Sequence, residues 1–297
     1  MTEFMDYVGF VLAPQMVNGL ALGIAVILVA LGLTIIFGLL DVINMSHGEF
    51  YAVGAFGAIA LAATGLNFWV LVALVPILMI PLGVLTERYL IRRVYDGKDR
   101  HVTTLLLTFG LGLIAEDIFK LLFGPNTHRP ENPLPGGTVL AGIFVPNYRL
   151  FLIGIGAAII AAVAFVVYRT RLGAMVRAAA FDRNMVASLG VRVSWVYAGT
   201  FAFGVALAGL AGVLLAPVYS VFPTMGRDFI LLAFTVVIVG GMGSIWGAVA
   251  AGLLLTQIQA LASLAISPVW TDPIVFGVMV LFLTFRPQGL FGKLGHA

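Results

Sequence analysis

Nine long apolar runs constrain the fold of this chain more than any other feature of its sequence. They cover residues 15–40, 50–66, 68–86, 104–123, 150–168, 195–216, 229–242, 245–266 and 273–285. A helix needs about 20 apolar residues to cross the hydrocarbon core of a membrane, and 61% of the 297 residues are hydrophobic. The runs are continuous and do not alternate with polar residues, so strands are not expected. The sequence therefore predicts an all-α polytopic membrane protein with eight or nine transmembrane helices.

The stretch LDVINMSHGEFY, residues 40–51, interrupts this apolar sequence near residues 41–49. Ser46-His47-Gly48-Glu49 matches the S-x-x-E capping box, in which the serine accepts from a backbone N–H and the glutamate reaches back to the cap. A helix is therefore expected to begin at about residue 47. Two interpretations stay open. The polar groups only complete a helix end, or a half-helix N-terminus at membrane depth meets a polar solute.

A second interruption lies near residues 240–247, within VVIVGGMGSIWGAVAAG (236–252). It repeats the order of the first one: an apolar run, a glycine-rich break, a serine and a new apolar run. Paired breaks in the two halves of a membrane protein are typical of a translocation path. The residues predicted to line this path are Asn44, Ser46, His47, Glu49, Thr108, Thr235, Gly243 and Ser244.

Basic residues predict the orientation of the chain. Twelve of the 16 Lys and Arg residues lie in residues 88–100, in residues 169–192 and in the tail. The positive-inside rule places these segments and the C-terminus in the cytoplasm, which puts the N-terminus and the loop 124–149 outside. That loop is rich in Pro and Gly and is expected to pack as a cap on the outer face. No soluble domain is visible, so residues 1–297 are expected to form a single transmembrane domain.

One cytoplasmic segment is too polar to span a membrane but has the sequence of a helix. Residues 174–189 lack Gly and Pro, and Gly190 follows at a position where helices often end in a left-handed residue. The side chains predicted to share its apolar face are Met175, Ala179, Val186 and Leu189. An isolated helix of this length is marginal in water. It is therefore expected to dock, either on its own membrane domain or on a partner protein.

Residue types and motifs that the sequence lacks disfavour several classes of function. The chain has no cysteine, so it offers no thiol nucleophile. It has no P-loop to bind ATP, no metal-ligand spacing and no intramembrane protease motif, and no cofactor or enzymatic activity is expected. The net charge of +3 is explained by topology and not by nucleic acid. An autonomous channel or ion-coupled carrier is the rival from another class, although most apolar runs lack the charged residues that such carriers use.

Four stretches occur in a characteristic order: VALGLTIIFGLLDVINMSHGEFYAVGAF (29–56), RAAAFDRNMVASLGV (177–191), VIVGGMGSIWGAVAAGLLL (237–255) and FRPQGLFG (285–292). Together they resemble the membrane permease subunit of branched-chain amino-acid ABC importers, the LivH type. The resemblance runs from about residue 15 to residue 292, which is nearly the whole chain.

This resemblance implies a bacterial cytoplasmic-membrane importer of branched-chain or similar hydrophobic amino acids. The implied partners are a second related permease, two P-loop ATPases that bind ATP-Mg, an extracytoplasmic substrate-binding protein and membrane lipid. Urea or short amides are alternative substrates, because related permeases carry them. The implied coupling helix covers about residues 174–190, and its ATPase docking residues are Arg177, Ala178, Ala179, Asp182 and Gly190. The acidic residue of the family's loop is missing beside Arg177, and Asp182 is the nearest acid.

Overall fold

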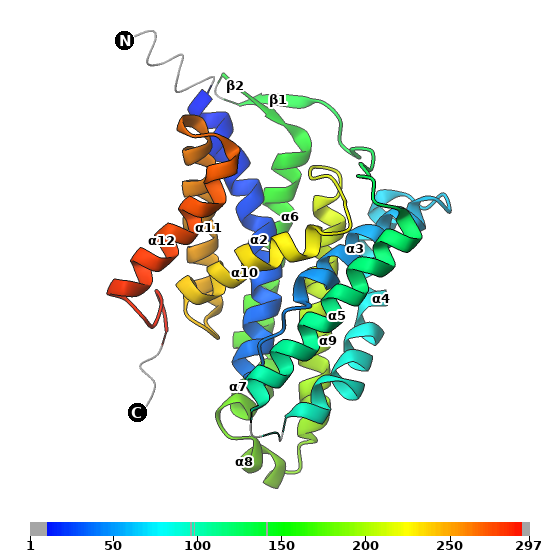
Figure 1. The fold of residues 1–297 in the computed structure, drawn as a ribbon, viewed down its shortest axis with the longest axis vertical. Helices are drawn as coiled ribbons and strands as arrows, with labels where there is room; N and C mark the ends of the chain where they lie inside the picture. Colours follow the sequence, from blue (N-terminus) through cyan, green and yellow to red (C-terminus); the bar gives the residue numbers. More distant parts are fainter. Residues whose placement is uncertain (1–10, 96, 98, 141, 293–297) are drawn as a thin grey trace.

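The computed structural model describes residues 11–95, 97, 99–140 and 142–292. Its helices are α2 (Ala13–Leu40), α3 (His47–Ala62), α4 (Phe68–Tyr89), α5 (Arg100–Phe123), α6 (Asn147–Arg169), α7 (Arg171–Phe181), α8 (Arg183–Ser188), α9 (Val193–Leu215), α10 (Met225–Gly240), α11 (Ile245–Ala265) and α12 (Thr271–Phe285). Two short 3₁₀ turns, η2 (Ile91–Val94) and η3 (Pro268–Trp270), and two strands, β1 (Gly137–Leu140) and β2 (Ile143–Pro146), complete the described elements. Each predicted apolar run coincides with one helix (Figure 1), so the polytopic helical fold is confirmed.

Five helices of the described chain are long and apolar enough to cross a membrane: Ala13–Leu40, Phe68–Val94, Asn147–Arg169, Val193–Leu215 and Ile245–Ala265. Helices α3 and α10 have 16 residues each. At about 1.5 Å per residue each is roughly 24 Å long, which is shorter than the hydrocarbon core of about 30 Å. These two short helices adjoin the breaks near 41–49 and 240–247, so both predicted interruptions are present.

Helices α2 and α9 form the centre of the bundle, and 78% of the most apolar window of each is buried. Helices α3 and α4 pack on α9, and α11 packs on α2. Glycines allow close contact between α3 and α9: a methyl group at Gly54 would clash with the backbone of Gly209, and one at Gly212 with the carbonyl of Tyr51. Such small residues let membrane helices gain packing energy where lipid supplies little hydrophobic driving force.

The loop 124–149 contains a β-hairpin that the sequence did not predict, whereas the apolar runs are helical as expected. Strands β1 and β2 pair antiparallel, from Gly137 opposite Pro146 to Leu140 opposite Ile143. The pairing satisfies backbone groups in a segment that has no helix. Strand β2 packs on α2 and α6, and two 2.8 Å backbone hydrogen bonds join His128 to Val221. The loop is packed on the helices, as predicted.

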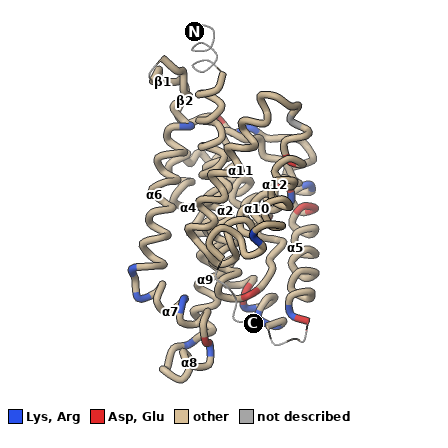
Figure 2. Tube along the Cα trace, turned by 90° about the vertical axis from the view of Figure 1, so that its left-hand side faces the viewer, with Lys and Arg blue, Asp and Glu red and all other residues tan. Residues whose placement is uncertain are grey.

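The hairpin and the Arg-rich helices α7 and α8 lie at opposite ends of the molecule (Figures 1 and 2). Opposite ends are what the predicted topology requires of loop 124–149 and of residues 169–194. Which end faces the cytoplasm stays a prediction.

The segment 174–189 is two helices, so its prediction as one continuous helix is wrong. Helix α7 ends at Phe181, and Asp182 begins α8 by accepting hydrogen bonds from Asn184 N at 2.8 Å and Met185 N at 2.9 Å. Aspartate is among the strongest N-cap residues, because its carboxylate accepts hydrogen bonds from the unpaired backbone N–H groups of the first helical turn. Gly190 has a φ of +83°, which confirms the predicted left-handed end.

Candidate functional site

The first break begins where α2 ends. Asp41 has a φ of +51°, the only positive φ of a non-glycine residue in the described chain. Its carboxylate forms an ion pair with Arg100 and lies 3.6 Å from His101 Nε2, both in the first turn of α5. The polar side chain that ends α2 is therefore held by the neighbouring helix.

Ser46 does not form the predicted capping box, although α3 does begin at His47. The Ser46 hydroxyl donates to Asn44 Oδ1 at 2.7 Å, and the Ser46 backbone N–H donates to the same oxygen at 3.1 Å. Asparagine often closes such a turn with its own side chain. Asn44 therefore orders the turn before α3, no side chain caps the helix itself, and Glu49 does not reach back to the cap.

Contacts with two other helices hold the first break in place. Met45 N donates to Thr108 Oγ1 of α5 at 3.0 Å, and the Thr108 hydroxyl is 2.7 Å from the carbonyl of Thr104. His47 Nε2 lies 3.2 Å from the carbonyl of Val29 in α2. Three polar atoms of this region have no hydrogen-bond partner among the described residues: Asn44 Nδ2, His47 Nδ1 and Glu49 Oε2. The break thus carries unused polar groups deep in the bundle.

The second break is capped locally. Gly241 and Gly243 have φ values of +96° and +82°, and Ser244 Oγ accepts from Gly247 N at 3.1 Å. The tail also holds this break, because Leu290 N donates to Val239 O at 2.8 Å. No motif in the sequence predicts this role of the tail.

A pocket of about 830 Å³ lies between the two breaks and α7. Asp41 and Arg100 line it from the first break, and Gly243 and Ser244 from the second. Residues of α7, among them Arg177 and Ala179, form another wall. The structure thus brings one part of the predicted path together with part of the predicted docking segment.

The other predicted path residues do not line this pocket. They are all buried, with relative exposures of 6% or less: Asn44, Ser46, His47, Glu49, Thr108 and Thr235. Thr108 and the first four meet around the first break. Thr235 hydrogen-bonds to Leu231 O within its own helix α10, and no hydrogen bond links it to the others.

The α7–α8 segment turns some predicted residues inward and others outward. Ala179 and Val186 are buried, whereas Phe181 is 92% exposed and Leu189 is 74% exposed. The predicted single apolar stripe is therefore wrong, because the cap at Asp182 changes the helix direction between its two halves. Arg177 donates to Val167 O and lies over the ring of Tyr168, 5.8 Å from its centroid. Ala178, Asp182 and Gly190 are exposed.

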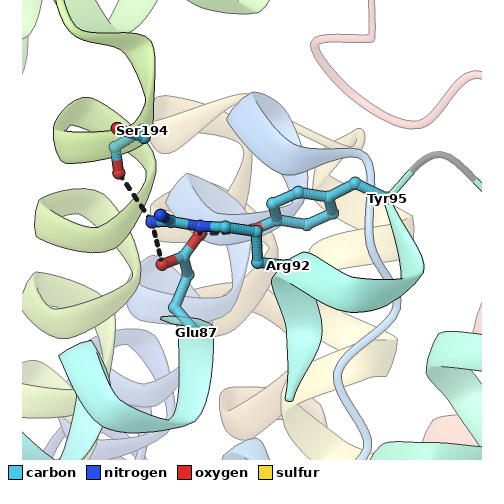
Figure 3. Close-up of polar contacts among 4 residues, drawn as sticks. All are labelled: Glu87, Arg92, Tyr95 and Ser194. Atoms are coloured by element: carbon cyan, nitrogen blue, oxygen red, sulfur yellow. Dashed lines mark hydrogen bonds and ion pairs between the residues drawn. The ribbon is translucent and has the colours of Figure 1, made fainter. Parts of the chain in front are cut away.

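A buried carboxylate connects α4 to the start of α9 (Figure 3). Glu87 is fully buried, accepts from Arg92 Nη2 at 2.6 Å and from the Tyr95 hydroxyl at 3.2 Å. Arg92 also donates to the carbonyl of Ser194 at 3.0 Å. Burial and the neighbouring Glu87 carboxylate raise the pKa of Tyr95, so its hydroxyl stays a donor at neutral pH. The only sign of this contact in the sequence is a Glu and an Arg that follow an apolar run, and the contact was not predicted.

Comparison with known proteins places the chain in one family. The family described as branched-chain amino acid transport system, permease component, matches residues 15–284. The chain belongs to this family. It is a transport subunit of the ABC permease type and not a catalytic ATPase.

The chain is similar to curated relatives over nearly its whole length. It is 30% identical to the high-affinity branched-chain amino acid transport permease BraD of Pseudomonas aeruginosa, and the match covers 94% of this chain and 95% of the relative. It is 31% identical to LivH of Escherichia coli with the same coverage. LivM of Escherichia coli is 27% identical over 89% of this chain and 67% of its own length. No solved structure matches the chain.

Proposed function

We propose that this chain is one of two permeases in a binding-protein-dependent importer of branched-chain or similar hydrophobic amino acids in the bacterial cytoplasmic membrane. The second permease is a related subunit, two P-loop ATPases with bound ATP-Mg drive the pair, and an extracytoplasmic binding protein delivers the substrate. The names of the relatives LivH and BraD support this substrate class. Urea or a short amide is the alternative substrate.

One observation carries the proposal: a single pocket joins the docking segment to both helix breaks. Ala179 and Arg177 of α7 share its lining with Asp41 of the first break and Ser244 of the second. A shift of α7 therefore changes the surroundings of both breaks without any intermediate element. Broken helices are where transporters place their moving parts, so this arrangement suits a permease driven from α7.

The exposed apolar side chains of the α7–α8 segment support docking of an ATPase. Phe181, Met185 and Leu189 are 92%, 61% and 74% exposed. They lie at the Arg-rich end that we expect in the cytoplasm, where exposed apolar side chains would contact water. Exposed apolar patches next to charged residues mark protein interaction sites. Ala179 and Val186, on the inner side, hold the segment on its own membrane domain. Both docking alternatives therefore apply, one to each side of the segment.

The proposed substrate path runs past the first break. Its buried polar residues are Asn44, Ser46, His47, Glu49, Thr108 and Thr235, and Gly243 and Ser244 extend it to the pocket. The N-terminus is proposed to lie outside and the C-terminus in the cytoplasm. Residues 1–10 and 293–297, which carry these ends, fall outside the described residues.

The test replaces the exposed aromatic side chain of the docking segment. We expect Phe181→Glu to lower co-purification of the ATPase subunits and ATP-driven leucine uptake, because a charge would enter an apolar contact. Val269→Glu is the matched control: Val269 is 80% exposed and lies in η3, away from α7. Normal ATPase binding and uptake in Phe181→Glu would contradict this docking site.

A second measurement separates the importer from its rival. Leucine uptake by the purified chain alone, in liposomes without nucleotide and driven by an ion gradient, would establish a carrier and refute the importer. We expect no uptake in that experiment, and uptake only with the ATPases, ATP-Mg and the loaded binding protein.

A further inference from the structure

The side chain of Glu49 lies inside the bundle, and one of its two carboxyl oxygens has no hydrogen-bond partner among the described residues. Glu49 is 6% exposed, and the oxygen without a partner is Oε2. The carboxyl group sits between α5 and α10: a methyl group at Gly112 would lie 3.6 Å from Glu49 Cγ, and one at Gly226 would lie 2.5 Å from Oε2. Two glycines thus leave the space that this carboxyl group occupies.

Other charged groups surround this carboxyl group. Glu116, one helical turn after Gly112 on α5, is 6% exposed and lies 3.4 Å from Arg227 Nη1. Lys120 Nζ lies 2.8 Å from the other Glu116 oxygen. Arg227 attracts a negative charge on Glu49, whereas Glu116 and Asp228 repel it. The carboxyl groups lie deep, whereas the Arg227 side chain is 49% exposed.

Packing alone does not account for an acidic residue at this position. A buried carboxylate without a hydrogen-bond partner is costly, and an apolar or amide side chain would fill the same space at lower cost. Charged residues inside a membrane domain line aqueous cavities or bind charged groups. A cation that reaches Glu49 from the exposed side would remove this cost.

Apolar side chains flank the same charged groups. Phe109 and Leu113 are 46% and 43% exposed, and their three- and four-residue spacing to Gly112 and Glu116 places them on one side of α5. The exposed surface here therefore offers a guanidinium and an aliphatic or aromatic contact, and the carboxyl groups lie directly beneath it. An α-amino acid with an apolar side chain presents the complementary groups.

We propose that Glu49, Glu116 and Arg227 form a binding site for a zwitterionic apolar amino acid at the junction of α3, α5 and α10. Glu49 binds the substrate ammonium and Arg227 its carboxylate, while Phe109 and Leu113 contact its side chain. Glu116 holds Arg227 in position through their ion pair. This inference rests on the proposed transport function and gives that path a specific recognition site. Urea has neither an ammonium nor a carboxylate group, so it would not bind at this site.

The first experiment compares isosteric variants in the complete importer, reconstituted with its partner subunits and radiolabelled leucine. We expect Glu49→Gln and Arg227→Gln to lower leucine uptake by about tenfold or more, the effect of losing one charged hydrogen bond. Assembly of the complex should stay at the wild-type level. Glu49→Asp, which keeps the charge, should retain part of the uptake. Asp117→Asn is the matched control, because Asp117 is 73% exposed on the same helix and forms an ion pair with Lys120.

The second experiment measures binding without the binding protein. A single cysteine at position 113 in this cysteine-free chain should react with maleimide more slowly when leucine is present. 4-Methylpentanoate, which lacks the ammonium group, should give no protection, and Glu49→Gln should abolish the protection by leucine. Equal protection by both compounds would overturn the assignment of Glu49.

Each outcome tests a separate statement. Wild-type uptake by Glu49→Gln would overturn the site and leave the transport function intact. Joint loss of assembly and uptake in both Glu49→Gln and Glu49→Asp would show a packing role and also overturn the site. A complete wild-type importer that takes up no leucine would instead refute the proposed function.

Discussion

Replacing Asp182 by alanine should join α7 and α8 into one helix. The Asp182 carboxylate accepts two backbone hydrogen bonds, from Asn184 and from Met185, and it is the side chain that separates the two helices. Alanine removes both acceptors and is the best helix former. The merged helix would alter the angle between Phe181 on α7 and Met185 on α8, which are both exposed.

The expected magnitude follows from the loss of one N-cap. Replacing an aspartate cap by alanine costs about 0.5–2 kcal/mol, which corresponds to a change of about two- to thirtyfold in the local equilibrium. Two short hydrogen bonds favour the upper part of this range, and the exposure of Asp182 to water favours the lower part. The free energy of global unfolding should change little, because Ala179 and Val186 stay buried when the cap is lost.

Hydrogen exchange of residues 183–188 in the assembled importer measures this change directly. We expect faster or redistributed exchange in Asp182→Ala, together with lower uptake per ATP hydrolysed. Asp182→Asn keeps an oxygen that caps the helix but removes the charge, so it should behave like the wild type. If Asp182→Asn fails as severely as Asp182→Ala, the charge contacts the ATPase and the cap is not what matters. Wild-type exchange and coupling in Asp182→Ala would refute the argument.

Two further predictions concern the breaks and the topology. Ser244→Ala should lower the thermal unfolding midpoint of the complex more than Ser46→Ala, because only Ser244 caps a backbone N–H; the reverse order would restore the capping-box interpretation of Ser46. Single cysteines at Gly97 and Leu189 should react only from the cytoplasmic side and one at Asn132 only from outside; external labelling at either of the first two would contradict the positive-inside assignment.

The sequence predicted the helices because lipid imposes a length and a continuity on every spanning segment. It also predicted both breaks and the left-handed Gly190, where local backbone chemistry decides. It failed where two local patterns compete. Ser46 matches a capping box, but Asn44 lies two residues earlier and takes up its hydroxyl. In the docking segment most residues favour a continuous helix, but the single N-cap residue Asp182 ends α7 and begins α8.

Tertiary contacts explain the other omissions. The hairpin depends on β2 packing against α2 and α6, which no single stretch of sequence reveals. The bond from Arg92 to Ser194 joins residues 102 positions apart, and the approach of Glu49 to Gly112 and Gly226 depends on how three helices meet. The sequence therefore indicated which polar residues gather at the first break but not the groups that they contact, and their role in a substrate path stays a prediction.

The two breaks differ in what holds them, and this difference suggests how motion could pass through the chain. Other helices hold the first break: α5 through Thr108 and Arg100, and α2 through the carbonyl of Val29. Ser244 caps the second break from within, and the tail binds it at Val239. We therefore expect a shift of α7 to move the second break as a rigid unit. At the first break, the same shift should change the surroundings of Asp41, which lines the shared pocket. The buried residues Asn44 to His47 should move only when α5 moves relative to α3, and that movement would also separate Glu116 from Glu49.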